Sequence, residues 1–393
     1  WDVCAAKRAL FLHDEKLAPV AHLLFSKRNP FHPSHNYSVQ FDSPWHPGGG
    51  VWSLTVPMEN GSLVPEKAQP SCLFDAGTGV VRDPSLSFDA KKIYYGYRSD
   101  FTNYYRIFEQ DVATGVRRQI SDNGPFHDFW PTPLPDGGLA FITTRCKKKF
   151  ICWRPQTAVL FRMELDGTKV EPLSYANLTE FAPSVLDDGR ILWTRSEYVD
   201  KGADYGHTLW TIRADGTYPE LTFGNTIALP QGFANGRQVP GTREVCATMI
   251  SHFGDLNGPV ALLDLTKGPH DASAISSLTP EIPWPGFSPN SETFREPIPI
   301  TKDVILVAHA PQNSFGLYLI DRYGNRELLY TDPSIDCICP QPFVARPVPP
   351  VMRGALLPAL AEKDKGQFSI ENVYRGLEGQ VQPGAAKYLR ICE

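Results

Sequence analysis

Short apolar runs, separated by turns rich in proline, glycine and aspartate, recur along the whole chain. Four stretches share one order: proline, short strand, Asp-rich turn, apolar strand, variable loop, apolar strand, glycine turn and final strand. They begin with DPSLSFDAKKIYYGYR, WPTPLPDGGLAFITTR, FAPSVLDDGRILWTRS and EPIPITKDVILVAHA. Strands rich in Ile, Leu, Tyr, Trp and Phe suit pleated surfaces that pack against one another. The pattern therefore predicts an all-β chain.

The spacing of these units narrows the prediction. Pro84, Pro133 and Pro183 lie about 50 residues apart, which is within the range of known repeat periods. The Asp-Gly pairs at 166–167 and 188–189, with a third at 215–216, predict tight hairpin turns. One four-stranded blade cannot bury both faces, whereas a closed ring of blades can. The repeat therefore predicts a β-propeller of four-stranded antiparallel blades.

Two less regular units complete the set. Residues 20–70 contain HLLFSKR and GGGVWSLTV, and residues 227–267 contain EVCATMISHF and PVALLDL. Six blades are therefore favoured, although residues 333–350 could form a seventh with an N-terminal strand. We divide the chain into three parts: an N-terminal segment (1–19), the propeller (20–345) and a Pro-rich clasp or linker to a following domain (346–393).

The predicted second strands end in basic residues, where packing alone would favour apolar ones. The six aligned positions are Arg28, Arg98, Arg145, Arg195, His252 and His309. Guanidinium groups form planar forks that hold carboxylate, sulfate or phosphate, so the ring predicts a basic funnel for an anionic ligand. Alternatively, each arginine pairs with an acid of its own or the next blade. The candidate acids are Asp83, Asp100, Asp128, Glu180, Glu197, Asp255 and Glu296.

The segment NPFHPSHNYS (29–38) falls between the second and third strands of the first predicted blade, on the face where the funnel opens. Other loops on that rim contain His207 and His252. A histidine near Asp or Tyr can act as a general base or a metal ligand, so these two are the candidate catalytic residues. A single loop histidine is more often an ordinary turn residue, so this interpretation depends on the blade alignment.

Charge and cysteine spacing exclude several classes of protein. The net charge is −5 and the pI is near 6.1, so no basic excess indicates nucleic-acid binding. The chain contains no run of about 18 apolar residues, so the sequence predicts no membrane-spanning helix. The eight cysteines form no CxxC, which removes the usual zinc-ribbon, thioredoxin-like and c-type haem motifs. Cys146 and Cys152 flank a predicted loop and could pair; buried free thiols are the alternative.

Three stretches resemble a known family. They are ANLTEFAPSVLDDGRILWTRSEYVDKGADYGHTLWTIRADGT, ANGRQVPGTREVCATMISHFGDLNGPVALLD and the tail SIENVYRGL with AAKYLRI. These are similar to the middle-domain family of the hydrazine synthase alpha subunit, which includes many bacterial propeller proteins with TolB-like repeats. The resemblance covers residues 20–393. It implies a six-bladed propeller between other domains of a periplasmic or extracellular protein.

The resemblance also implies one metal ligand. In the hydrazine synthase itself, a cysteine of this domain binds zinc beside a c-type haem held by the next domain. The matching residue here is Cys146, with Cys152 second, and zinc or calcium are the candidate ions. Because CxxCH is absent, no covalently bound haem is expected in this chain. The expected partners are neighbouring domains, including c-type haem domains.

Two functions from different classes follow. The first is a non-catalytic propeller module that organises a larger protein through its rim and its tail, 350–393. The second is a carbohydrate-active propeller, a lyase or hydrolase, acting on an anionic polysaccharide. A lyase would use Arg145 or Arg195 to neutralise a uronate, and His252 or His207 as its base. The fold by itself does not choose between them.

Overall fold

A computed structural model describes residues 2–38, 45–149, 156–197, 206–286, 289–352 and 368–390. The chain divides into two compact units, Trp1–Arg353 and Gly354–Glu393. The strands lie in the first unit. Among the described residues, no helix combines the length and the apolar character needed to cross a membrane.

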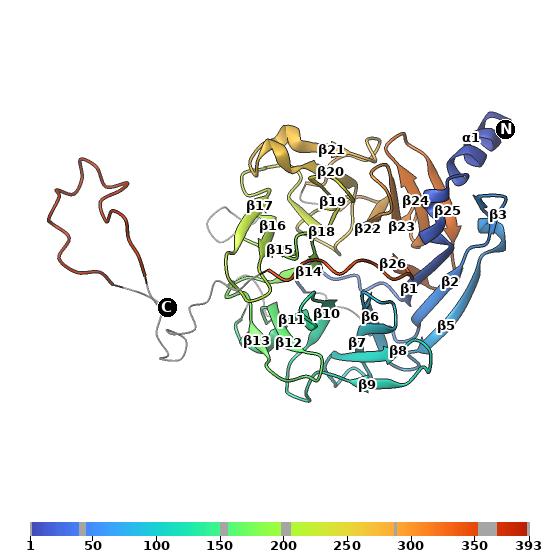
Figure 1. The fold of residues 1–393 in the computed structure, drawn as a ribbon, viewed down its shortest axis with the longest axis horizontal. Coiled ribbons are helices and arrows are strands. Elements are labelled where there is room, and N and C mark those ends of the chain that lie inside the picture. Colours follow the sequence, from blue (N-terminus) through green and yellow to red (C-terminus); the bar gives the residue numbers. More distant parts are fainter. Residues whose placement is uncertain are drawn as a thin grey trace. The chain divides into compact units, whose positions relative to one another are not determined.

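The strands of the first unit form antiparallel sheets arranged around a common centre (Figure 1). Three sheets run through consecutive strands. The first contains β6 (Val80–Leu86), β7 (Lys92–Arg98), β8 (Arg106–Asp111) and β9 (Arg117–Gln119). The second contains β10 (Asp128–Pro133), β11 (Gly138–Thr143), β12 (Val159–Glu164) and β13 (Glu171–Pro172). The third contains β22 (Thr293–Pro299), β23 (Val304–Ala310), β24 (Gly316–Asp321) and β25 (Arg326–Tyr330).

Two further groups of four strands are joined by one parallel bridge between His207 and Gly232. One group is β14 (Glu180–Val185), β15 (Ile191–Ser196), β16 (His207–Ile212) and β17 (Glu220–Phe223). The other is β18 (Gly232–Gln238), β19 (Glu244–Ile250), β20 (Val260–Asp264) and β21 (Ile275–Ser277). The predicted fold class, a propeller of four-stranded antiparallel blades, is confirmed.

The remaining blade is assembled from both ends of the propeller. Its strands are β26 (Asp336–Pro342), β1 (His22–Arg28), β2 (Gly50–Thr55) and β5 (Gln69–Asp75), in that order. β26 pairs antiparallel with β1, from Leu23 opposite Pro342 to Arg28 opposite Asp336. β26 therefore supplies the inner strand of the first blade and belongs to no separate blade. A small hairpin of β3 (Met58–Glu59) and β4 (Ser62–Leu63) lies outside it.

Each inner strand contains a β-bulge at the same place. The residue at the bulge has a positive φ of 47–56°, and the next residue is proline in five strands and glycine in the sixth. These residues are Asp83, Trp130, Ala182, Asn235, Glu296 and Cys339. A bulge leaves one residue out of the ladder, so a proline there sacrifices no hydrogen bond. In β10 the equivalent proline is Pro131 and not Pro133, which instead pairs with Leu139 in the ladder.

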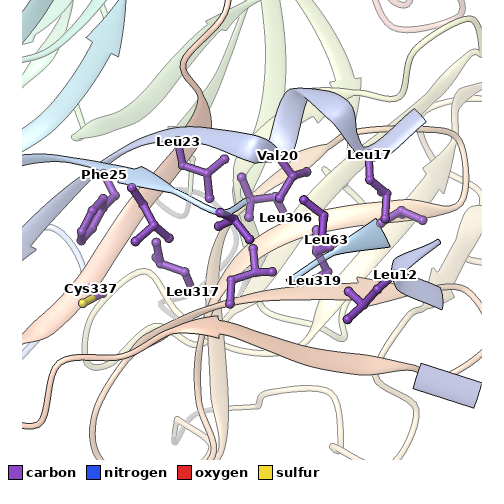
Figure 2. Packing of buried hydrophobic residues seen from close by; sticks show 14 residues of the cluster. Leu12, Leu17, Val20, Leu23, Phe25, Leu63, Leu306, Leu317, Leu319 and Cys337 are labelled. Atoms are coloured by element: carbon purple, nitrogen blue, oxygen red, sulfur yellow. The ribbon is translucent and has the colours of Figure 1, made fainter. Parts of the chain in front are cut away.

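The N-terminal segment packs onto the ring. It contains α1 (Asp2–Leu12) and η1, a 3₁₀ helix (Glu15–Ala21), and both precede β1. Elsewhere, short 3₁₀ turns occur in the loops: η2 (Pro65–Lys67), η3 (Thr144–Cys146), η5 (Leu265–Lys267) and η6 (Ala272–Ala274). Leu12, Leu17 and Val20 are buried in one cluster with Leu306 of β23 and Leu317 of β24 (Figure 2). The segment thus covers apolar surface of the blade beside the closing one.

A buried ion pair lies beside the β1–β26 junction. Lys27 of β1 is 5% exposed, and its Nζ donates to Asp332 Oδ2 at 2.7 Å and to the Tyr330 hydroxyl at 3.0 Å. The same ammonium group lies 3.9 Å from the centre of the Trp52 ring. Burial raises the pKa of Asp332, but hydrogen bonds from Lys27 and Ser334 outweigh it and bring the pKa to about 2.

We expect Asp332→Asn to lower the free energy of unfolding by about 2 kcal/mol at pH 7, because Lys27 loses its charged acceptor. The native pKa of Asp332 lies below its unfolded value, so its contribution is complete above about pH 4 and is lost as the pH falls towards 2. Urea unfolding of both proteins across this range measures the difference. Glu15→Gln is the control, because the Glu15 side chain has no partner among the described residues. A difference that persists unchanged at pH 2 would contradict this role.

Candidate functional site

Residues 29–38 cover the face of the ring where the inner strands begin; we call this loop the plug. Its Tyr37 is fully buried and shares a cluster with Phe181 of β14, Ala234 of β18 and the partly buried Trp130 of β10. These three residues come from inner strands of three different blades. A side chain from the first blade therefore fills the mouth of the central funnel.

Backbone contacts hold the plug across the ring. His35 forms an isolated antiparallel bridge with Phe253, in the loop after β19. The amide of Gly254 donates to the Ser34 carbonyl at 3.2 Å, and Asn36 Nδ2 donates to the Ser251 carbonyl at 3.0 Å. The segment 29–38, which the sequence placed between two strands of the first blade, is thus a structural bridge between two blades.

The two candidate catalytic histidines lie together beneath the plug. His207 Nε2 is 3.4 Å from His252 Nδ1, and each residue is 2% exposed. Asn36 Nδ2 donates to His207 Nε2 at 3.3 Å, which places the ring proton on Nδ1, 2.9 Å from Ser196 Oγ. Burial and then the neighbouring His252 lower the pKa of His207 to about 3. His207 is therefore neutral at physiological pH.

The six predicted funnel residues lie within two residues of the ends of the second strands. Three of them bind or stack on groups of their own blade. Arg98 donates to the carbonyls of Asn103, at 2.7 Å, and Phe101. Arg195 lies over the Trp210 ring at 4.8 Å. His309 stacks on the ring of Phe294, with 3.9 Å between centroids, and also contacts the carbonyl oxygen of Thr293.

Arg145 adopts the alternative role, pairing with acids. Its Nε and NH2 groups bind both oxygens of Asp128 at 3.0 and 2.8 Å, and NH1 binds Asp122 at 2.7 Å. Asp128 is fully buried and also accepts a hydrogen bond from the Thr143 hydroxyl at 2.6 Å. These contacts hold the guanidinium fork and raise the pKa of Arg145 despite its burial.

A charge cluster that sequence reasoning missed lies on the inner strands. Arg82 Nε binds its neighbour Asp83 at 2.5 Å, and Arg295 Nε binds its neighbour Glu296 at 3.0 Å. Arg295 also binds Asp255 at 2.8 Å. Three of the proposed acid partners are therefore occupied by inner-strand arginines and not by the ring. The signal was present as Arg-Asp-Pro at 82–84 and Arg-Glu-Pro at 295–297, two copies of one motif at the bulge.

Arg28 is the ring residue that joins this cluster. It is 3% exposed, and its guanidinium lies 3.4 Å from the centre of the Phe31 ring in the plug. Burial lowers the pKa of Arg28, and the charge of Arg295 lowers it further. Burial raises the pKa of Asp255, but Arg295 and Arg28 outweigh this and hold it at about 2. The positive charge of Arg28 thus acts on Asp255, an acid of another blade.

The metal prediction has no supporting ligand set in the described part of the chain. Cys146 donates from Sγ to the Thr157 carbonyl at 3.2 Å, and burial raises the pKa of its thiol. Within the described ranges, no three His, Cys, Asp or Glu side chains are placed to hold a metal ion. Cys152 lies outside the described residues. The role of Cys146 as a metal ligand, with zinc or calcium as the ion, therefore stays a prediction, and no chemistry is derived from it.

Comparisons with known proteins place the fold. No protein-family model and no curated protein sequence matches the chain. Several solved structures do match the chain. Hydrazine synthase from Kuenenia stuttgartiensis matches with a TM-score of 0.69 and 16% identity, over 86% of this chain and 49% of that chain. TolB from Acinetobacter baumannii matches with a TM-score of 0.54 and 15% identity, over 81% and 66%.

The fold is that of a TolB-like β-propeller. A chain of a nidogen/laminin complex also shares it, with a TM-score of 0.53 and 12% identity over 83% of this chain and 99% of that one. The chain spans about half the length of the hydrazine synthase chain that it matches. At these identities the likeness concerns the fold alone.

The arginine contacts predict unequal effects on stability. Arg145→Met should lower the free energy of unfolding by about 3 kcal/mol, because it leaves the buried Asp128 carboxylate unpaired. Arg195→Met should cost about 1 kcal/mol or less, because Arg195 stacks on Trp210 and forms no ion pair in the described part of the chain. Denaturant unfolding measures both. Equal losses would show that the pairing with Asp128 is not what distinguishes the two arginines.

The buried His207 predicts a pH dependence of stability. Its pKa is about 3 in the folded protein and about 6.5 in an unfolded chain, so the unfolded state binds the additional proton between these values. The contribution of His207 to stability is therefore complete above about pH 6.5. Below this pH, proton uptake by His207 in the unfolded state lowers the free energy of unfolding by about 1.4 kcal/mol per pH unit. His207→Gln should reduce the slope of unfolding free energy against pH by that amount. An unchanged slope would mean that His207 takes up its proton while folded.

Proposed function

We propose that this chain is a scaffold and binding module of a larger periplasmic or secreted protein, related to the middle-domain family of the hydrazine synthase alpha subunit. The plugged face is where it docks a neighbouring domain. One observation carries this proposal: Tyr37 and the rest of the plug fill the mouth of the funnel. That face therefore offers a formed surface, and the fold likeness to half of a longer chain suits a module within a larger protein.

The buried histidines favour a scaffold over a carbohydrate-active enzyme. A general base must come within hydrogen-bond reach of the proton it removes. His207 and His252 are each 2% exposed and contact each other and the plug. Arg145 is engaged by two aspartates, so neutralising a uronate would require breaking both pairs. We therefore do not assign a lyase or hydrolase reaction to these groups.

Charge on the plugged face indicates the chemistry of the partner. Arg98 and Arg195 form no ion pair within the described part of the chain, where their contacts are carbonyl groups and aromatic rings. Asp100 acts on Arg98 and the buried Glu180 acts on Arg195, in each case without an ion pair, so these positive charges are only partly offset. An acidic surface on the docked domain, including the propionates of a haem that it carries, is complementary. An acidic glycan has the same charge and would be an alternative occupant.

Cross-linking of the protein purified from its native source tests the orientation. Lys147 and Lys149 are exposed after β11, on the plugged face, whereas Lys91 and Lys302 are exposed at turns on the opposite face. We expect a lysine-reactive cross-linker to join Lys147 and Lys149 to another domain or subunit, as identified by mass spectrometry. Cross-links confined to Lys91 and Lys302 would reject the proposed docking face.

The same assembly allows a charge-reversal test of the proposed surface. Arg98→Glu with Arg195→Glu should weaken association with the cross-linked partner at least about tenfold, because like charges would then face each other. Arg243→Glu with Lys302→Glu, exposed on the opposite face, makes the same change in net charge and is the control. Equal weakening by the two double variants would show a general charge effect and no specific surface.

A further inference from the structure

A cavity of about 710 Å³ lies at the centre of the ring, towards the end opposite the plug. Its walls are the inner strands at and beyond their bulges. Residues 343–350, which we call the strap, form a further wall. The Arg346 amide donates to the Phe88 carbonyl at 2.8 Å, and the Pro350 carbonyl packs against Gly189, where no Cβ would fit. The strap thus crosses the ring from β26 to the β14–β15 turn, as the red segment in Figure 1 shows.

Arg237 is the unusual group in this cavity. It lies two residues beyond the bulge of β18, where the other inner strands carry the uncharged residues Ser85, Thr132, Ser184, Ile298 and Gln341. Its NH1 donates to the Gly236 carbonyl at 2.9 Å. No carboxylate forms an ion pair with it within the described part of the chain. Asp83 and Glu296 line the same cavity but are already bound by Arg82 and Arg295.

Leaving the charge of Arg237 without a carboxylate partner lowers the stability of the folded protein. Burial lowers the pKa of Arg237 to about 10, with Arg346 acting in the same direction and Glu296 opposing it. The guanidinium is still protonated at neutral pH. Arg237 is half-buried, and a cation drawn partly out of water without a carboxylate partner is unfavourable. An anion that enters the cavity would supply the missing partner.

The rest of the wall favours an anion with an apolar body. Four of the five prolines that follow the bulges line the cavity: Pro84, Pro131, Pro183 and Pro340. Trp130 lines it too, and in the described part of the chain its indole N–H meets no hydrogen-bond acceptor. The volume is within the usual range for small-molecule sites, which are mostly apolar with a few placed polar groups.

We propose that this cavity binds a small organic monocarboxylate, with its carboxylate on Arg237 and its apolar body between the proline walls and Trp130. A single guanidinium fork matches the two oxygens of a carboxylate. A phosphate dianion would be less suitable, because the Asp83 and Glu296 carboxylates line the same space as Arg237 and Arg346 and would repel a second negative charge. The site is separate from the plugged face and does not depend on the docking proposed there.

Calorimetric titration with benzoate tests the proposal, with benzyl alcohol as the neutral probe and phenyl phosphate as the dianion. We expect benzoate to bind the wild-type protein at least about tenfold more tightly than either of the other two, because only benzoate forms a well-matched charge-assisted pair with Arg237. Absence of benzoate binding, or equal binding of benzyl alcohol, would overturn it.

Variants of Arg237 link the binding to this residue. Arg237→Gln should weaken benzoate binding at least about tenfold, and Arg237→Lys should have an intermediate effect, since it keeps the charge but loses the fork. Arg243→Gln, on the exposed turn of the same blade, should bind as wild type. Unchanged binding by Arg237→Gln would overturn the proposal.

Melting temperatures without ligand separate binding from a structural role. Arg237→Gln should melt no lower than the wild type, because it removes a half-buried cation that has no carboxylate partner in the described part of the chain. A variant that melts well below the wild type would show that the arginine is needed for folding, and would overturn the assignment of Arg237 to a ligand. Arg237→Lys keeps the charge, so benzoate binding by this variant can be compared with the wild type even if Arg237→Gln is unstable.

Discussion

The pairing of β26 with β1 is the interaction on which the rest of the structure depends. An open row of blades would leave two sheet faces and two strand edges in water, and closure removes both. Here closure joins a strand from the end of the propeller to one from its beginning, within one blade. Supporting contacts gather at the same place: the Lys27–Asp332 pair beside the junction, and the leucines of α1 and η1 packed on the neighbouring blade.

The second constraint is the bulge repeated in every inner strand. It turns one residue into a left-handed conformation and sets that residue beside the axis of the ring. Where the bulge sequence is Arg-Asp-Pro or Arg-Glu-Pro, the acid folds back onto its own arginine. Charges are thereby placed at the crowded centre as neutral pairs, which lowers the cost of burying them. In β18 the corresponding segment is Ala234-Asn235-Gly236, which contains neither the arginine nor the acid, and Arg237 follows it without a neighbouring acid.

The two ends of the funnel are closed in different ways, and this shapes what each can do. At one end the plug is anchored by Tyr37 among inner-strand side chains and by backbone contacts to the loop after β19. That end suits contact with another folded domain. At the other end the strap leaves a cavity lined by Arg237 and by its own Arg346, neither of which forms an ion pair in the described part of the chain, and this cavity suits a small ligand. Binding and docking would therefore occupy opposite faces of one rigid ring.

The sequence by itself determined the propeller and the order of strands in most blades, because strand periodicity and Asp-Gly turns act over a few residues. It also placed 29–38 between the second and third strands of the first blade. Only the tertiary structure decided that Arg145 binds Asp128 and Asp122, that His207 meets His252, and that Tyr37 fills the funnel. These contacts join residues far apart along the chain, and ring closure brings them together; no local pattern encodes which partner a long polar side chain will reach.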